Sequence, residues 1–388
     1  MDLDESLPEN EASMDTVLPS RADAIYLNLE PDENIDAHDV NSILDNSDVD
    51  SALGDSETWP SSTASLRSSI VRAREENGRI YHGYKDGKYV LPTDQEELDR
   101  QTFQYQLCQL TFDNRLSFAP ICRPHRVLDV GCGVGIWALD FGTRLRRRSE
   151  TFAHRGTGEE HPESEVIGVD LSPVQPGLCV HQRALSGFDT DYTSTPPNVH
   201  YEIDDLEEEW SFSRNFDYIH SMMMTGAFRD WPNFYRQAFE NLNPGGWVEC
   251  QDINFPMKCD DDTIAPQSDL GRWNELMMEA GTLSGFRLDL CDRAAEMMSA
   301  AGFVDIVRIP YKWPINQWPK DVRYKTLGEW TEANFVFGLE SIMLALFTRF
   351  LGWKKEEVWE FIARVIAEWR DLRNHGYFEI YVTYGRKP

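Results

Sequence analysis

Residues 127–135 read VLDVGCGVG, an apolar stretch that carries one acidic residue and runs into three glycines at alternate positions. Glycine has no side chain, so a turn of this composition can adopt unusual dihedral angles and let ligand atoms approach the backbone closely. A helix predicted over 136–147 directs its first, unpaired N–H groups at the same place. The dinucleotide-binding pattern GxGxxG is not met, because Ile136 stands at its sixth position. The candidate ligand-binding residues of the turn are Asp129, Gly131, Gly133 and Gly135.

Strand and helix signals alternate along the chain around this turn. Predicted strands cover 126–130, 165–170, 199–203, 216–221, 247–251, 305–309 and 378–384, and predicted helices cover 94–116, 136–147, 231–242 and 289–301. Alternation of this kind is typical of a parallel α/β sheet. The sequence therefore predicts an α/β fold with a helical lead-in before its first core strand.

One region, 320–374, breaks the alternation, because it reads as two or three helices rich in Leu, Phe and Trp. If the strand at 305–309 is parallel to the core strands and the last strand is antiparallel, this block leaves and rejoins the sheet at the carboxyl ends of the parallel strands. Ligands of open α/β sheets bind outside that edge. We expect the block to lie over or beside the ligand, and three roles stay open for it: a cap over a substrate pocket, an extension of the core, or an oligomer contact.

Composition divides the chain into five predicted parts. They are a disordered acidic tail over 1–65, a helical lead-in or lid over 66–120, the core over 121–319, a helical cap over 320–375 and the final strand over 376–388. The first 60 residues hold seventeen Asp and Glu and one Arg, and so carry −16 of the net charge of −29. Such a segment cannot bury enough surface to offset its ordering entropy, and it is either a solvated tail or a partner-binding segment. The acidic balance disfavours nucleic acid as a substrate, because affinity for phosphates is carried by Lys and Arg.

The compartment is predicted from cysteine usage and from the character of the N-terminus. The seven cysteines form no CxxC pair, which indicates reduced intracellular thiols and no zinc site, so no metal is expected. An acidic N-terminus is neither a signal peptide nor a mitochondrial presequence. The most apolar stretch, 335–351, contains Glu340 and Arg349 and is too short for an uninterrupted span of about 20 residues. We therefore expect a cytoplasmic or nuclear protein that does not act at a membrane.

Acidic residues stand at the ends of the next two predicted strands. Asp170 ends the strand 165–170, where a carboxylate can accept both hydroxyls of a ribose, and Asp204 and Asp205 follow the strand 199–203, where an acidic side chain can meet an adenine amino group. Each of these residues can instead be a helix cap. Together with the later stretches FDYIH and NPGGW, their order and spacing are typical of class I methyltransferases, which predicts S-adenosylmethionine as the cofactor.

Several longer runs narrow the resemblance. They are ENGRIYH at 76–82, KYVLP at 88–92, DLSPVQP at 170–176, EIDDLEEEW at 202–210, GAFRDW at 226–231 and YVTYGRKP at 381–388. From about residue 70 onward the sequence resembles fungal LaeA-like methyltransferases. The resemblance implies a Rossmann-like sheet, S-adenosylmethionine as methyl donor, and a link to fungal secondary metabolism, either as an enzyme on a small-molecule substrate or as a nuclear regulator that acts with velvet-type protein partners. The loops over 143–164 and 178–196 depart from the family.

Methyl transfer from a sulfonium is an in-line displacement, which an enzyme can accelerate largely by positioning the two reactants in a dry site. If the acceptor is a hydroxyl, a base helps, and His220 at the end of its strand is the first candidate both for this catalytic role and for cofactor contact. His82 and His375 follow, and a packing role stays open for all three. Three tyrosines of the lead-in can form a lid over the cofactor or pack on the sheet: Tyr81, Tyr84 and Tyr89.

Overall fold

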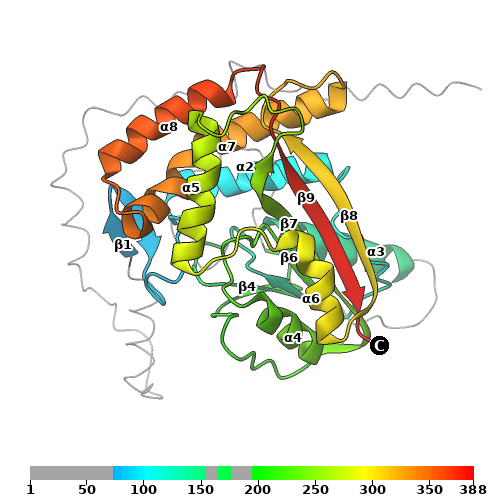
Figure 1. Ribbon diagram of the computed structural model, residues 1–388. Helices are drawn as coiled ribbons and strands as arrows, with labels where there is room; N and C mark the ends of the chain where they lie inside the picture. Colours follow the sequence, from blue (N-terminus) through cyan, green and yellow to red (C-terminus); the bar gives the residue numbers. More distant parts are fainter. Residues whose placement is uncertain (1–72, 154–163, 176–194) are drawn as a thin grey trace, which may run out of the picture. The chain divides into compact units, whose positions relative to one another are not determined.

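The computed structural model describes residues 73–153, 164–175 and 195–388, and Figure 1 shows their arrangement. The acidic tail predicted over 1–65 lies outside the described residues, as do parts of the loops over 143–164 and 178–196 and the side chains of 146–153. The described elements are organised by one seven-stranded sheet.

The sheet is mostly parallel, as predicted. Its strands are β3 (Arg126–Val130), β4 (Glu165–Asp170), β5 (Val199–Ile203), β6 (Phe216–Met222), β7 (Leu242–Lys258), β8 (Val304–Pro314) and β9 (Tyr377–Arg386). Their order in space is β5-β4-β3-β6-β7-β9-β8, and β9 alone runs against its neighbours β7 and β8. Counted along the chain this is 3-2-1-4-5-7-6, the doubly wound order with one antiparallel strand inserted near an edge. The strand order reverses direction beside β3, so the crevice expected for a ligand lies at the carboxyl end of that strand.

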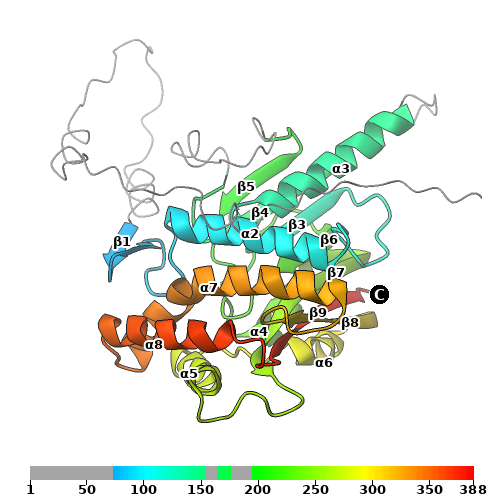
Figure 2. The same cartoon turned by 90° about the horizontal axis from the view of Figure 1, so that it is seen from above.

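Seven α-helices of the described residues surround the sheet (Figure 2). They are α2 (Gln95–Thr111), α3 (Ile136–Ala153), α4 (Trp231–Asn241), α5 (Asp269–Ser284), α6 (Ala294–Ala301), α7 (Val322–Phe350) and α8 (Lys355–Trp369). Successive strand residues point to opposite sides of the sheet, so apolar side chains stand on both faces, and helices cover both. Val127 of β3 packs in a cluster with Trp137 of α3, whereas its neighbour Leu128 packs in a cluster with Phe234 of α4 and Met298 of α6.

A third cluster forms a helical layer beyond the carboxyl edge of the parallel strands. It joins α2, α5, α7 and α8 to the far ends of the last three strands, with Phe255 of β7, Trp313 of β8 and Phe378 of β9 at its base. Figure 2 shows α2, α7 and α8 lying side by side there, with α5 next to α8. Because β8 runs parallel to β7 and β9 antiparallel, the block between them leaves and rejoins the sheet at this edge, as expected.

The structure differs from the expected elements in the lead-in and in one missing helix. A hairpin of β1 (Ala73–Glu76) and β2 (Arg79–His82) precedes α2, so the lead-in is not purely helical. Its turn is Asn77-Gly78, with both residues at positive φ, the favoured two-residue hairpin turn. The unpredicted helix α5 follows β7, which continues beyond the expected 247–251 to Lys258 because it pairs with β9 along a ribbon.

Helix α7 is longer than the apolar stretch seen in the sequence. By length and composition alone its 29 residues pass for a membrane span, a test that buried core helices also pass. In this protein 56% of the most apolar 18-residue window is buried against the rest of the structure. The helix packs on α2, α5 and α8 in the helical layer.

Candidate active site

The carboxyl ends of β3, β4, β5 and β6 open into a cavity of about 250 Å³. One side of the cavity is formed by the glycine turn after β3 and the acidic residues after β4 and β5. The other side is formed by apolar side chains of β6, β7, α5 and α7, and residues of α2 also line the cavity. Residues predicted from widely separated parts of the sequence therefore meet in one space.

The glycine turn is held against β4. The backbone N–H of Gly131 donates to the carbonyl of Val169 at 2.8 Å. Gly131, Gly133 and Gly135 have φ values of +65°, +52° and +81°, a region that side chains rarely adopt. A Cβ at Gly135 would also lie 2.6 Å from the hydroxyl oxygen of Tyr201, so glycine is required there by backbone and by space.

Asp170 links the glycine turn to the end of β4. Its two carboxylate oxygens accept the backbone N–H groups of Gly133 and Ser172, each at 2.9 Å. Gln175 adds a second link, since its amide nitrogen donates to the carbonyl of Gly133 at 2.7 Å. Burial raises the pKa of Asp170 to about 6, although the two N–H donors act in the opposite direction. The carboxylate borders the cavity, as a ribose ligand must.

Asp204 and Asp205 also border the cavity, but they differ in exposure. Asp205 is 4% exposed, pairs with Lys88 and accepts the backbone N–H of Glu207 at 3.1 Å. Asp204 is exposed to solvent and accepts the N–H of Asp205 at 2.8 Å. Of the two, Asp205 has the more fixed carboxylate.

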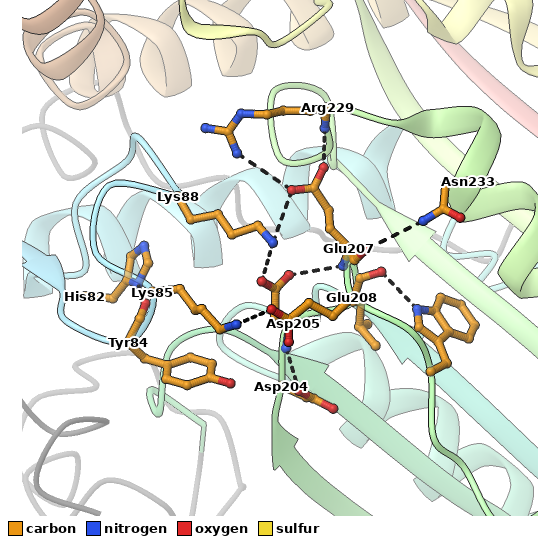
Figure 3. Close-up of polar contacts among 12 residues, drawn as sticks. His82, Tyr84, Lys85, Lys88, Asp204, Asp205, Glu207, Glu208, Arg229 and Asn233 are labelled. Carbon is orange, nitrogen blue, oxygen red and sulfur yellow. Dashed lines mark hydrogen bonds and ion pairs between the residues drawn. The ribbon is translucent and has the colours of Figure 1, made fainter. Parts of the chain in front are cut away.

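The segment 83–92 after β2 forms a strap that is tied to this acidic loop (Figure 3). Figure 3 shows Lys88 reaching between Asp205 and Glu207, and the distance from Lys88 Nζ to Glu207 Oε2 is 3.3 Å. Lys85 pairs with Glu208. Both attachments bring basic side chains of the lead-in to the end of β5, so the strap borders the same cavity as the glycine turn.

Only one of the three lead-in tyrosines reaches the cavity. Tyr89 borders it, and burial together with the nearby Glu97 raises the pKa of its hydroxyl. Tyr84 is half-buried on the strap, whereas Tyr81 is 2% exposed and packs under the guanidinium of Arg349. Tyr81 therefore has a packing role and does not form a lid over the cavity.

His220 lies beneath the cavity, not in its wall. It is fully buried, its Nδ1–H donates to Asp129 Oδ1 at 2.9 Å, and its ring stacks on Trp137 with centroids 3.6 Å apart. Asp129 is 2% exposed, borders the cavity, and burial raises the pKa of its carboxyl. A base must reach the acceptor proton directly or through one water, so this geometry does not favour the predicted catalytic role or a cofactor contact for His220. It makes His220 a positioning residue for Asp129.

The other two histidines are farther from the chemistry. His82 is 5% exposed, lies with Nδ1 2.6 Å from the carbonyl oxygen of Tyr84, and has its pKa lowered by burial. His375 pairs with Asp261 at 2.6 Å, at the start of β9. Neither histidine borders the cavity.

The apolar side of the cavity is a chamber beneath the helical layer. Its walls include Met222, Met223, Phe255, Met277, Phe335 and Leu346. Methionine and aromatic side chains fill irregular apolar spaces. The helix α7 of the block therefore covers the space next to the cofactor side together with α5, which lies outside the block, and the core cluster shared by α5, α7 and α8 also makes the block part of the core.

Sequence reasoning missed a buried carboxylate that shapes this chamber. Asp252 of β7 is 4% exposed and accepts the backbone N–H groups of Met224, Thr225 and Ile253 at 2.9–3.0 Å. It holds the turn in which Met223 has a φ of +54°. Asp252 stands with Glu249 among the apolar residues of 247–257, and these two acidic residues were the available signal.

Comparisons with known proteins agree with this geometry. A family model described as a methyltransferase domain matches residues 99–306, more than half of the chain. The methyltransferase pytC of Aspergillus terreus is 34% identical over 84% of this chain and 92% of its own length. The secondary metabolism regulator LAE1 of Cochliobolus heterostrophus is 31% identical over 81% of this chain and 94% of its own, and the regulator laeA of Monascus pilosus is 30% identical over 92% and 90%.

Among solved structures, a phosphoethanolamine N-methyltransferase of Haemonchus contortus in complex with S-adenosylmethionine has a TM-score of 0.40 and 15% identity over 84% of this chain and 73% of that chain. The family match and the full-length relatives determine the assignment. The chain belongs to the fungal LaeA-like family of S-adenosylmethionine-dependent methyltransferases.

Proposed function

We propose that this methyltransferase transfers the methyl group to a small, largely apolar acceptor, such as a metabolite that bears a hydroxyl group. One observation carries the proposal: a single cavity joins the glycine turn to an apolar chamber covered by α5 and α7. Small-molecule sites are concave and mostly apolar, with a few placed polar groups. A macromolecular acceptor would instead need an open surface beside the glycine turn.

The residues around the glycine turn fit the cofactor. The glycines leave backbone accessible where a side chain would project, and the buried Asp129 Oδ2 has no hydrogen-bond partner within the described residues. We assign the ribose hydroxyls to Asp170 and the adenine amino group to Asp205, with Asp204 beside it. S-adenosylmethionine supplies an activated methyl group on a sulfonium. The chain itself orients the two reactants and excludes water from the apolar chamber.

The cofactor assignment is tested by Gly133→Asn, with S-adenosylhomocysteine binding measured by calorimetry. Asparagine tolerates the φ of +52°, and a Cβ at this position would meet only the end of the Gln101 side chain, so the protein is expected to fold. Filling the cradle should weaken binding roughly tenfold or more. Gly245→Asn is the matched control, because φ is +83° there and no atom lies within 4 Å of a Cβ. Equal binding by the two variants would contradict the site.

The small-molecule assignment is tested with labelled S-adenosylmethionine and an extract of fungal metabolites. Transfer of label to an extractable apolar product is the expected result. If the protein binds S-adenosylhomocysteine but labels no small molecule, the acceptor assignment fails while the cofactor site stands.

A second function, assembly with velvet-type proteins in a cytoplasmic or nuclear complex, is favoured by the two relatives named as regulators and by exposed apolar side chains on the helical block. These side chains are Val322, Phe337, Trp359 and Leu372, with exposed fractions of 77%, 46%, 39% and 56%. Co-purification of a velvet-type protein that is lost in Phe337→Ser would support this function. Failure to recover one from nuclear extract would count against it.

A further inference from the structure

A cluster of polar side chains, three of them buried and one half-buried, interrupts the apolar surroundings of the cavity on the α2 side. We call Glu97, Arg100, Gln104 and Asn334 the α2 polar cluster. Glu97 and Arg100 are 0% and 4% exposed and form two parallel bonds of 2.8 and 2.7 Å between guanidinium and carboxylate. Asn334 of α7 is 1% exposed, and its Oδ1 lies 3.4 Å from Arg100 Nη1. Burial of such groups is costly unless they are paired.

The cluster fixes the orientation of Gln104. The side-chain oxygen of Gln104 accepts from Arg100 Nη1 at 2.7 Å and from Asn334 Nδ2 at 3.3 Å. Arginine has donors only, so the atom that faces it must be the oxygen of the carboxamide. Gln104 Nε2 has no hydrogen bond to the part of the chain that the structure describes, and Gln104 borders the cavity. A neutral N–H donor is thereby left for a molecule in the cavity.

We propose that Gln104 determines acceptor specificity by donating a hydrogen bond to an oxygen atom of the acceptor, and that Glu97, Arg100 and Asn334 are positioning residues for its carboxamide. The inference deepens the proposed function and rests on it. The charge of Arg100 is matched by Glu97, so the cluster does not call for an anionic ligand. The acceptor class is an apolar molecule with a carbonyl, ether or hydroxyl oxygen.

The test compares two probes of similar size on the protein loaded with S-adenosylhomocysteine. One probe is 2-acetylnaphthalene, which has a carbonyl oxygen, and the other is 2-isopropylnaphthalene, which has none. We expect the wild type to bind the ketone roughly tenfold or more tightly than the hydrocarbon, because a bound hydrocarbon displaces water from the N–H donor and gives it no partner. Binding is measured by ligand-observed NMR titration.

Gln104→Glu removes the N–H donor of the side chain but keeps the oxygen that Arg100 and Asn334 contact. A carboxylate still accepts from Arg100 and Asn334 but places an oxygen where the N–H group stood, so the preference for the ketone should disappear while hydrocarbon binding stays within about threefold. Gln106→Glu is the matched control, since Gln106 lies on the same helix and does not border the cavity. If Gln104→Glu fails to fold, Gln104→Met replaces it with the same expected loss of preference.

The outcomes are distinguishable. An unchanged ratio of ketone to hydrocarbon affinity in the folded Gln104 variant overturns the inference, and so does a wild type that binds S-adenosylhomocysteine but neither probe. Failure of the wild type to bind S-adenosylhomocysteine overturns the proposed function and, with it, the inference. A ratio that falls in the Gln104 variant and is kept in the Gln106 variant supports it.

Discussion

Replacement of Asp170 by asparagine should stabilise the protein without cofactor at pH 8 while weakening cofactor binding. Burial raises the pKa of Asp170 from 3.8 to about 6, so keeping it ionised in the folded protein costs about 3 kcal/mol. The neutral carboxamide of the variant removes this cost. The carboxamide also places one of its N–H groups against a backbone N–H of Gly133 or Ser172. The hydrogen bond lost there lowers the free energy of unfolding by about 1–3 kcal/mol. The expected net gain at pH 8 is about 0–2 kcal/mol.

The difference in unfolding free energy between the Asp170→Asn variant and the wild type should change with pH, and this change is a more specific test than the value at one pH. A carboxyl whose pKa is raised by folding binds its proton more tightly in the folded state, so wild-type stability gains as the pH falls through about 6 toward 3.8. The advantage of the Asp170→Asn variant should therefore shrink by about 1.5 kcal/mol between pH 8 and pH 5. Urea unfolding of both proteins at the two pH values measures it. A difference that does not change with pH would refute the burial argument.

The same variant tests the role of the carboxylate. Hydrogen bonds to a charged group contribute about 1.5–3 kcal/mol, so affinity for S-adenosylhomocysteine should fall roughly 10- to 100-fold at pH 8. Asp217→Asn is the matched control: its carboxylate accepts the backbone N–H groups of His125 and Arg126 at the opposite end of the sheet. That variant should bind as the wild type does. Unchanged affinity in Asp170→Asn would remove Asp170 from the cofactor site.

Three further perturbations test the strap, the turn and the positioning residue. Lys88→Met removes the cation that pairs with the buried carboxylate of Asp205. The dissociation rate of S-adenosylhomocysteine, measured by stopped flow, should then increase about tenfold. An unchanged rate would show that the strap does not retain the cofactor. Gly135→Ala should lower the free energy of unfolding, measured in urea, by about 1–3 kcal/mol more than Gly245→Ala does, because a Cβ meets a steric conflict only at Gly135. Equal losses in the two variants would contradict this expectation. His220→Asn should lose about 1–3 kcal/mol of stability but keep the shape of the pH–rate profile, whereas a base would lose about 10²- to 10⁴-fold in rate.

Most of the core strands could be predicted because they are short, largely apolar runs closed by a turn signal, whereas VHYEI at 199–203 alternates apolar and polar residues. The helix α5 was missed although its signals were present: Ser268 caps its first turn, Gly285 ends it at a φ of +84°, and Leu270, Trp273 and Met277 are spaced for one buried face. The hairpin at 73–82 was also signalled, by Asn77-Gly78. Both elements therefore follow from local signals in the sequence.

The cofactor side and the acceptor side of the cavity differ in how far sequence can predict them. Asp170 and the glycines follow strands directly, and parallel strands bring their carboxyl ends to one edge, so local patterns suffice. Gln104 is oriented by Arg100, four residues away on the same helix, and by Asn334, 230 residues away, and Asp252 acquires its role from a turn 27 residues earlier. The spacing of Arg100 and Gln104 is local, but no local pattern carries the contact with Asn334 or the role of Asp252.

This division has a physical consequence for how the family can change its substrates. The cofactor side is built by residues that are close along the chain to β3, β4 and β5, whereas the chamber is walled by α5, α7 and one face of α2, which contact the cavity from outside the sheet. Side chains such as Met277 and Phe335 can change in size without moving the hydrogen bonds that hold the glycine turn. Substitutions there should shift the choice of acceptor while S-adenosylhomocysteine affinity stays constant, because sites that share no partner contribute independently. Relatives with different acceptors can therefore keep one cofactor site and differ in the helical layer above it.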